Sequence, residues 1–143
     1  MRLKNIITKL NLEQHVEMFG KVDNSLYKKL MIDSDVVINP CLKEGAVTTS
    51  FDAMSMGKPL ICIDTTGYTR YFSNENAFLI PLEGRTKVIS NLSKAILDLT
   101  DKTRRYRLGQ KSEVIAKSIT WQVRGEEIYN LISEKYSLFK MLD

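Results

Sequence analysis

Three short runs of consecutive apolar residues are the feature that most constrains the fold of this 143-residue chain. The runs cover residues 36–38, 60–63 and 77–80, and within each run neighbouring positions are apolar instead of alternating with polar ones. A strand with this pattern is buried on both faces, as in a parallel sheet that helices cover on both sides. We therefore predict an α/β fold with a parallel sheet flanked by helices.

Helical patterns precede and separate these runs. Apolar residues recur at helical spacing within residues 24–33 and 47–56, and Gly57 is a typical stop signal for the second of these helices. We also predict a helix over residues 4–10 and a short strand over residues 16–19.

After the third apolar run the chain changes to helices. The apolar positions form three helical stripes, over residues 88–99, 106–115 and 121–136. In the last stripe, Trp121 and Tyr129 are interpreted as core anchors. Because neither a linker nor an internal repeat is visible, residues 1–143 are treated as one domain.

Charge and cysteine content restrict the function classes. The chain carries 21 Lys and Arg against 17 Asp and Glu, a net charge of +4. This mild excess is typical of proteins that handle phosphorylated ligands and is too small to indicate nucleic-acid binding by itself. Cys41 and Cys62 lie in or beside apolar runs and are interpreted as reduced core thiols. With His15 as the one histidine, neither Ser-His-Asp catalysis nor a His-rich metal site is expected.

The apolar runs also bear on the cellular compartment. A helix that spans a bilayer needs about 20 apolar residues, far more than any run here contains. Residues 1–12 lack the apolar core and the cleavage site of a signal peptide. We therefore expect a cytoplasmic protein with at most peripheral membrane contact.

Residues 39–59 form the chemically informative segment, which consists of a strand end, a loop and the start of a helix. In an open parallel sheet, ligands bind beyond the carboxyl ends of the strands. A helix that begins there presents unpaired N–H groups and a partial positive charge, which suit a pyrophosphate. Gly45 permits close approach of the backbone to a ligand. Glu44 and Asp52 can face the same opening and accept hydrogen bonds from hydroxyls.

This segment resembles the donor-binding half of retaining glycosyltransferases with the GT-B fold, in the family called group 4 or group 1. The residues that match the family's pattern are Pro40, Glu44, Gly45, Asp52, Ala53, Met54, Gly57 and Pro59. Three further segments, residues 19–23, 63–67 and 76–81, resemble a Gly-x-Val loop, a glycine turn and an Asn-Gly-x-Leu-Val-Pro strand in the same order. The resemblance implies a Rossmann-like sheet, a truncated C-terminal half of a GT-B fold with extra C-terminal helices.

The resemblance also implies roles in binding a nucleotide-diphosphate sugar. Glu44 would hydrogen-bond the hydroxyls of the donor sugar and is the candidate catalytic residue, while Asp52 would bind the ribose hydroxyls. The donor phosphates would be held by backbone N–H groups at Gly45, Ala46, Val47 and Thr48. The base would be contacted by the loop formed by Gly20, Lys21, Val22 and Asp23. Such enzymes move the sugar to an acceptor hydroxyl with retained configuration, usually without a bound metal, so no cofactor besides the donor substrate is expected.

The family's pattern also includes parts that this sequence lacks. A full enzyme has an acceptor-binding domain, and its donor domain opens with two more strands that supply an Arg and a Lys for the phosphates. We therefore expect an incomplete chain that does not transfer sugar by itself. The sheet edge left exposed would favour a homodimer or a partner chain.

Alternative interpretations stay open. Asp52 stands where the family usually has Glu, and with Thr49 it also fits a capping box at the start of its helix. The chain could be a non-catalytic nucleotide-binding or assembly module of the same ancestry. The basic residues within 102–111 resemble a nucleic-acid or anionic-membrane patch, although an exposed helix face explains them better, so no specific nucleic-acid partner is expected.

Overall fold

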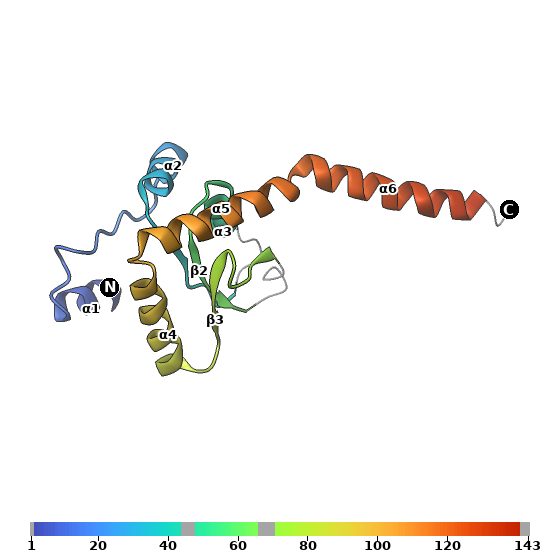
Figure 1. Cartoon of the computed structure of the whole chain (residues 1–143). Helices are drawn as coiled ribbons and strands as arrows, with labels where there is room; N and C mark the ends of the chain where they lie inside the picture. Colours follow the sequence, from blue (N-terminus) through green and yellow to red (C-terminus); the bar gives the residue numbers. More distant parts are fainter. Residues whose placement is uncertain (1, 44–47, 66–70, 141–143) are drawn as a thin grey trace. The chain divides into compact units, whose positions relative to one another are not determined.

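The computed structural model describes residues 2–43, 48–65 and 71–140, and within these residues three parallel strands form one sheet in the order β1-β2-β3 (Figure 1). The strands are β1 (Val37–Asn39), β2 (Leu60–Asp64) and β3 (Ala77–Pro81). Val37 lies opposite Leu60, and Leu60 lies opposite Ala77. The predicted strands at the three apolar runs and their parallel arrangement are therefore confirmed.

Helices account for most of the remaining described residues. They are α1 (Arg2–Lys9), α2 (Asn24–Asp33), α3 (Thr48–Ser55), α4 (Arg85–Asp98), α5 (Lys102–Ser118) and α6 (Trp121–Lys140). Each predicted helix is confirmed. The ends of α2 agree with the prediction, whereas the other helices have one or both ends shifted, because helical spacing locates the middle of a helix better than its caps. None of the helices in this part of the chain is both long and apolar enough to cross a membrane.

The chain divides into two compact units, residues 1–30 and residues 31–143. In the first unit, the predicted strand over residues 16–19 is wrong, since this segment is neither strand nor helix. Val16, Met18 and Phe19 are each 40–48% exposed. A strand is stabilised by hydrogen bonds to a neighbouring strand, and the sheet of the described chain contains no strand from this segment.

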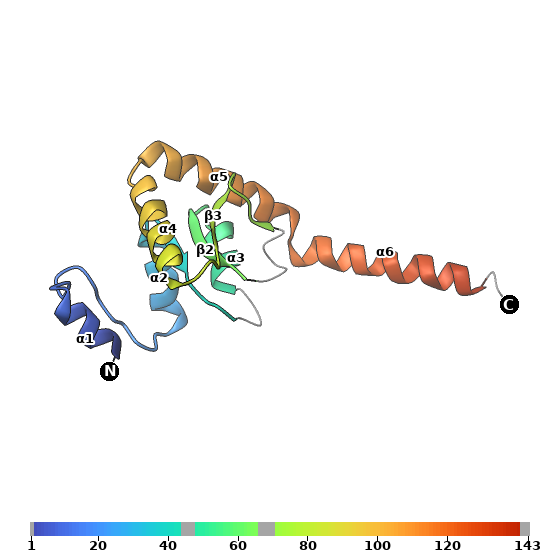
Figure 2. The same cartoon turned by 90° about the horizontal axis from the view of Figure 1, so that it is seen from below.

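The core of the second unit lies between the sheet and the helices that follow it. Its buried cluster consists of Ile61, Ile63, Ile80, Val88, Ala95, Leu99 and Leu108. The middle strand β2 is buried from Leu60 to Ile63, because it has a strand on each side and helices against the sheet. α3 contacts β1 and β2, and α4 contacts β3 (Figure 2).

The packing of α3 against α5 depends on two glycines. Gly57 ends α3 in the left-handed region, with φ of +62°, and the N–H of Lys58 donates to the carbonyl of Ala53 at 2.8 Å. This Schellman geometry confirms Gly57 as the helix stop. A Cβ at Gly109 in α5 would lie 2.0 Å from the carbonyl oxygen of Gly57. The two backbones therefore touch directly, and residue 109 has to be glycine.

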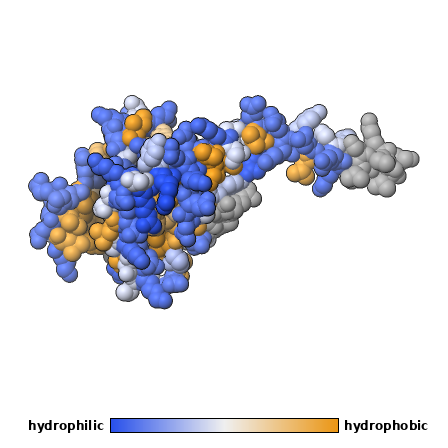
Figure 3. All heavy atoms as spheres, viewed as in Figure 1, coloured by the Kyte–Doolittle hydropathy of each residue, from blue (hydrophilic) through white to orange (hydrophobic). Residues whose placement is uncertain are grey.

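α6 differs from the sequence-based expectation. Trp121 is 93% exposed and Tyr129 is 71% exposed, so their interpretation as core anchors is wrong. The other large apolar residues of the stripe are also exposed, namely Ile128, Leu131, Ile132 and Tyr136. Figure 3 shows hydrophobic residues among hydrophilic ones along this helix. A periodic apolar pattern indicates a helix with one apolar face, but it does not indicate which part of the protein covers that face.

Candidate functional site

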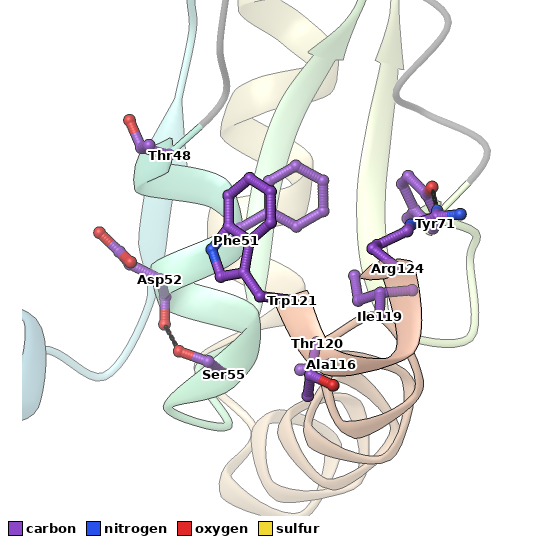
Figure 4. A pocket seen from close by; sticks show the side chains of 10 residues that line it. All are labelled: Thr48, Phe51, Asp52, Ser55, Tyr71, Ala116, Ile119, Thr120, Trp121 and Arg124. Atoms are coloured by element: carbon purple, nitrogen blue, oxygen red, sulfur yellow. Dashed lines mark hydrogen bonds between the residues drawn. The ribbon is translucent and has the colours of Figure 1, made fainter. Parts of the chain in front are cut away.

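An open cavity of about 530 Å³ lies between the start of α3 and the junction of α5 with α6 (Figure 4). It is lined by Thr48, Phe51, Asp52, Ser55, Tyr71, Ala116, Ile119, Thr120, Trp121 and Arg124. All of these residues belong to the unit formed by residues 31–143. The volume is in the range of sites that bind nucleotides and other small ligands, roughly 300–1,000 Å³.

A buried hydrogen bond fixes the start of α3 against the end of β1. The amide nitrogen of Asn39, the last residue of β1, donates to the hydroxyl of Ser50 at 3.0 Å, and both residues are buried. The Oδ1 atom of Asn39 accepts from the N–H of Cys41 at 3.2 Å, so the same side chain also orients the first residues after the strand. Buried polar groups need such partners. The first turn of α3 is consequently held at the carboxyl end of the sheet.

The second wall of the cavity is formed by the end of α5 and the start of α6, and the contact between two glycines helps to position it. Gly57 at the end of α3 meets Gly109 in the middle of α5. Thr48 and Asp52, earlier in α3, line the same cavity as Ala116 near the end of α5. The two helices therefore run antiparallel, and the end of α5 and the start of α6 lie beside the N-terminal part of α3.

The α3 side of the cavity is polar. Thr48 is exposed at the first position of the helix, and Asp52 is half-buried one turn later. The hydroxyl of Ser55 donates to the backbone carbonyl of Asp52 at 2.9 Å. In Figure 4 Thr48 and Asp52 lie on one side of the cavity, away from Tyr71 and Arg124. This side presents a carboxylate and hydroxyls, which suit the hydroxyl groups of a ligand.

The opposite side combines a cation with aromatic rings. The guanidinium of Arg124 donates a hydrogen bond to the hydroxyl of Tyr71 and lies 5.5 Å from the centre of the Tyr71 ring. Arg124 also pairs with Glu127, one turn later in α6. The Tyr71 ring packs edge-on against Phe51, with ring centres 5.7 Å apart. Phe51 and Trp121 lie between the two polar ends of the cavity (Figure 4).

The structure thus brings together two of the predicted site residues, Thr48 and Asp52. The candidate catalytic residue and the predicted phosphate-binding residues before Thr48 lie outside the described residues, namely Glu44, Gly45, Ala46 and Val47. These four residues directly precede α3 in the sequence.

The predicted base-binding loop belongs to the first unit. Gly20 has a positive φ of +67°, and Lys21 and Asp23 are exposed. The carboxylate of Asp23 accepts a hydrogen bond from the N–H of Leu26 at 2.8 Å, so it caps the start of α2. This contact gives Asp23 a structural role in addition to the predicted one.

Several residues that line the cavity were not predicted as site residues from the sequence. Phe51 and Ser55 follow Thr48 at helical spacing, so the period of α3 could have placed them on the same face. Arg124 follows Trp121 by one turn in the same way. Tyr71 could not have been found from spacing, because it comes from a different part of the chain and reaches the cavity only through the tertiary fold.

The basic residues of α5 make mainly structural contacts. Arg105 donates to the carbonyls of Leu99 and Thr100 at 2.7 and 3.0 Å and pairs with Asp35. The Arg104 guanidinium lies 4.9 Å from the centre of the Phe78 ring and also pairs with Asp98. These contacts favour the interpretation of the 102–111 segment as a helix face rather than as a nucleic-acid-binding patch.

The two cysteines differ in their surroundings. Cys62 in β2 is fully buried, and this burial, together with the nearby Asp64 carboxylate, raises the pKa of its thiol to about 12. Cys41 is exposed, so the interpretation of both cysteines as core thiols is correct only for Cys62. Position 41 follows β1 and has passed the end of the sheet. The described residues hold no group of three or more His, Cys, Asp and Glu side chains arranged to bind a metal.

Comparison with known proteins assigns the chain to a family. A family model described as glycosyl transferases group 1 matches residues 1–113. No curated protein matches the sequence significantly.

Solved structures share the fold over nearly the whole chain. The sucrose-phosphate synthase of Thermosynechococcus elongatus has a TM-score of 0.78 at 19% identity, covering 96% of this chain and 34% of its own. The pneumococcal O-GlcNAc transferase GtfA, solved with UDP and GlcNAc, has a TM-score of 0.77 at 21% identity, covering 93% of this chain and 27% of its own. HepE of Anabaena, solved with UDP and glucose, has a TM-score of 0.72 at 23% identity, covering 93% and 36%. The chain thus spans between about a quarter and a third of the length of these three proteins.

Proposed function

Since this chain belongs to the group 1 glycosyl transferases, we propose that it binds the nucleotide-diphosphate sugar from which such an enzyme transfers the sugar to an acceptor hydroxyl. The parallel α/β fold agrees with that of GT-B glycosyltransferases and confirms the predicted fold class. UDP-sugars are the first donors to test, because two proteins of similar fold were solved with UDP and a sugar.

One observation carries the proposal. Thr48 and Asp52, to which the family resemblance assigns the donor phosphates and the ribose, line the same cavity. That cavity lies where α3 begins, and Asn39 and Ser50 hold this end of α3 at the carboxyl end of β1. The carboxyl end of a parallel strand, followed by a helix N-terminus, is the usual place for a bound diphosphate.

The proposed chemistry assigns a role to each side chain. Asp52 accepts hydrogen bonds from the ribose hydroxyls, and the N–H groups that lead into Thr48 bind the diphosphate. Glu44 accepts hydrogen bonds from the sugar hydroxyls and so positions the anomeric carbon. In the transfer, the bond from that carbon to the diphosphate oxygen breaks and the acceptor oxygen bonds to the carbon. The acceptor's proton passes to the departing diphosphate, whose charge the helix N-terminus stabilises.

Isothermal titration calorimetry with UDP and UDP-glucose tests this assignment. We expect Asp52→Asn to weaken binding of both ligands by about tenfold, the effect of losing a hydrogen bond to a charged group. Glu44→Gln should weaken UDP-glucose binding by a similar factor and leave UDP binding unchanged. Glu83→Gln is the matched control, because Glu83 is exposed and lies outside the cavity.

The outcomes separate the competing functions. If the chain binds neither UDP-sugars nor GDP-mannose, the donor-binding proposal is overturned. If UDP binds but Glu44→Gln affects neither ligand, the non-catalytic nucleotide-binding module is the better interpretation.

A further inference from the structure

Four polar residues are buried in the described part of the chain, and they form two pairs. In the first pair, the hydroxyl of Ser112 in α5 donates to the backbone carbonyl of Asn76 at 2.9 Å, which holds α5 against the residue before β3. The second pair joins Asn39 at the end of β1 to Ser50 near the start of α3. An apolar pair could fill the same space without the cost of desolvating an amide, so the polar pair at this place calls for an explanation.

The side chain of Asn39 uses both ends of its amide. The nitrogen donates to the hydroxyl of Ser50 at 3.0 Å, and Oδ1 accepts from the N–H of Cys41 at 3.2 Å. The second bond forms an Asx turn, in which the intervening Pro40 has no N–H of its own. One buried side chain therefore links the point where the chain leaves the sheet to the third residue of α3.

The first turns of α3 are the part of the cavity wall that this link holds. Ser50 is fully buried, whereas Thr48, Phe51 and Asp52 on either side of it line the cavity. The first N–H groups of a helix have no partner within the helix, so their direction is set by how the helix begins. A hydrogen bond is directional, whereas apolar burial is not. The bond to Asn39 therefore fixes the rotation of α3 about its axis, and with it the direction of the groups that face the cavity.

We infer that Asn39 is a positioning residue for the bound diphosphate. Through Ser50 it sets the rotation of α3, and through the N–H of Cys41 it sets the direction in which the chain leaves β1. Asn39 itself does not line the cavity, so it acts only through these two residues. The inference rests on the proposed function, and it adds to the proposed ligand contacts a residue on which their geometry depends.

Two serine variants test the positioning role. Ser50→Ala and Ser112→Ala each delete one fully buried hydroxyl that makes a hydrogen bond, and neither serine lines the cavity. Both variants should lose stability in urea unfolding. In calorimetry, Ser50→Ala should weaken UDP binding by about tenfold, the upper end of what one hydrogen bond contributes, and Ser112→Ala should leave the affinity unchanged.

A double variant separates positioning from stability. Asn39→Leu combined with Ser50→Ala removes the hydrogen bond together with both polar partners, a replacement that costs little stability. We expect this protein to unfold close to the unmodified chain in urea and still to bind UDP about tenfold more weakly, because apolar contact does not fix the rotation of α3. Far-UV circular dichroism of each variant verifies that the helices are intact.

Amide hydrogen exchange measured by NMR reports the second bond of Asn39. The N–H of Cys41 should be protected in the unmodified chain and should exchange faster after Asn39→Leu, because its acceptor is removed. Ser50→Ala should leave this amide protected. Equal exchange of the Cys41 amide in the unmodified chain and in Asn39→Leu would overturn the link to the start of the segment that follows β1.

The remaining outcomes distinguish the inference from the proposed function. If UDP binds the unmodified chain, Ser50→Ala and the double variant with equal affinity, the positioning role is overturned while the proposed function stands. If Ser112→Ala weakens UDP binding as much as Ser50→Ala does, the loss follows from lower stability and the positioning role is again overturned. If the unmodified chain binds neither UDP, UDP-glucose nor GDP-mannose, both the inference and the proposed function are overturned.

Discussion

Gly109 in α5 lies against Gly57 at the end of α3, so closely that a Cβ at position 109 would be 2.0 Å from the Gly57 carbonyl oxygen. This contact sets the distance between the two helices whose other ends form the cavity. The stability of the unit and the shape of the cavity therefore depend on the same pair of glycines.

We expect Gly109→Ala to lower the free energy of unfolding by about 3 kcal/mol, because the added methyl group meets backbone atoms that cannot rotate away. The measurement is urea unfolding followed by circular dichroism. Gly125→Ala is the matched control, since Gly125 also lies in a helix and its Cβ would meet nothing within 4 Å. That variant should be more stable by about 0.5–1 kcal/mol, the helix propensity difference. Equal effects of the two substitutions would contradict the close contact.

The hydrogen bond between Asn39 and Ser50 should couple the end of β1 to the start of α3. Asn39→Ala leaves the buried hydroxyl of Ser50 without this donor and should cost about 1–3 kcal/mol of unfolding free energy. In a double-mutant cycle with Ser50→Ala, the coupling energy should be about 0.5–3 kcal/mol. Additive effects of the two substitutions would show that the bond does not hold the helix in solution.

Arg105 should stabilise the end of α4 through the carbonyls of Leu99 and Thr100. We expect Arg105→Ala to lower the melting temperature, with a loss of about 1–3 kcal/mol from hydrogen bonds to a charged group. Arg107→Ala, on the exposed face of the same helix, should have an effect within about 0.5 kcal/mol. If both variants keep full stability but lose binding to duplex DNA, the nucleic-acid interpretation of the segment gains instead.

The strands were predictable because each contains a short apolar run. The burial on both faces that this pattern predicts is complete for β2 only, since Ile38 in the middle of β1 is 41% exposed and Phe78 and Leu79 in β3 are half-buried. Leu60 to Ile63 are buried on both faces of the sheet. A strand that is buried in this way is apolar at consecutive positions, and this pattern is recognisable from the sequence alone. Gly57 was predictable for a similar local reason, since a helix that ends in the left-handed region favours glycine. Thr48 and Asp52 were assigned to one site by the family resemblance, and the structure shows that both line the same cavity.

Other features depend on partners that the local sequence does not specify. Val16 and Phe19 have the composition of a strand, but a strand requires a neighbour with which to exchange hydrogen bonds. Trp121 lies in a helical apolar stripe, which is equally compatible with a core face and with an exposed one. The contact of Tyr71 with Arg124 joins positions that are far apart in sequence, so it follows from the tertiary fold alone.

The two cysteines should differ in reactivity, and Cys62 should influence stability at high pH. Cys41 is exposed and should react with a thiol reagent in the native protein, whereas Cys62 should react only after unfolding.

Because the pKa of Cys62 is raised to about 12 in the folded state, the unfolded chain loses this proton at lower pH than the folded chain. The contribution of Cys62 is therefore complete below the ordinary thiol pKa and is lost as the pH rises from about 9 toward 12. Urea unfolding across this pH range should show a smaller alkaline loss for Cys62→Ala than for the unmodified chain. Identical pH slopes would contradict the burial of this thiol.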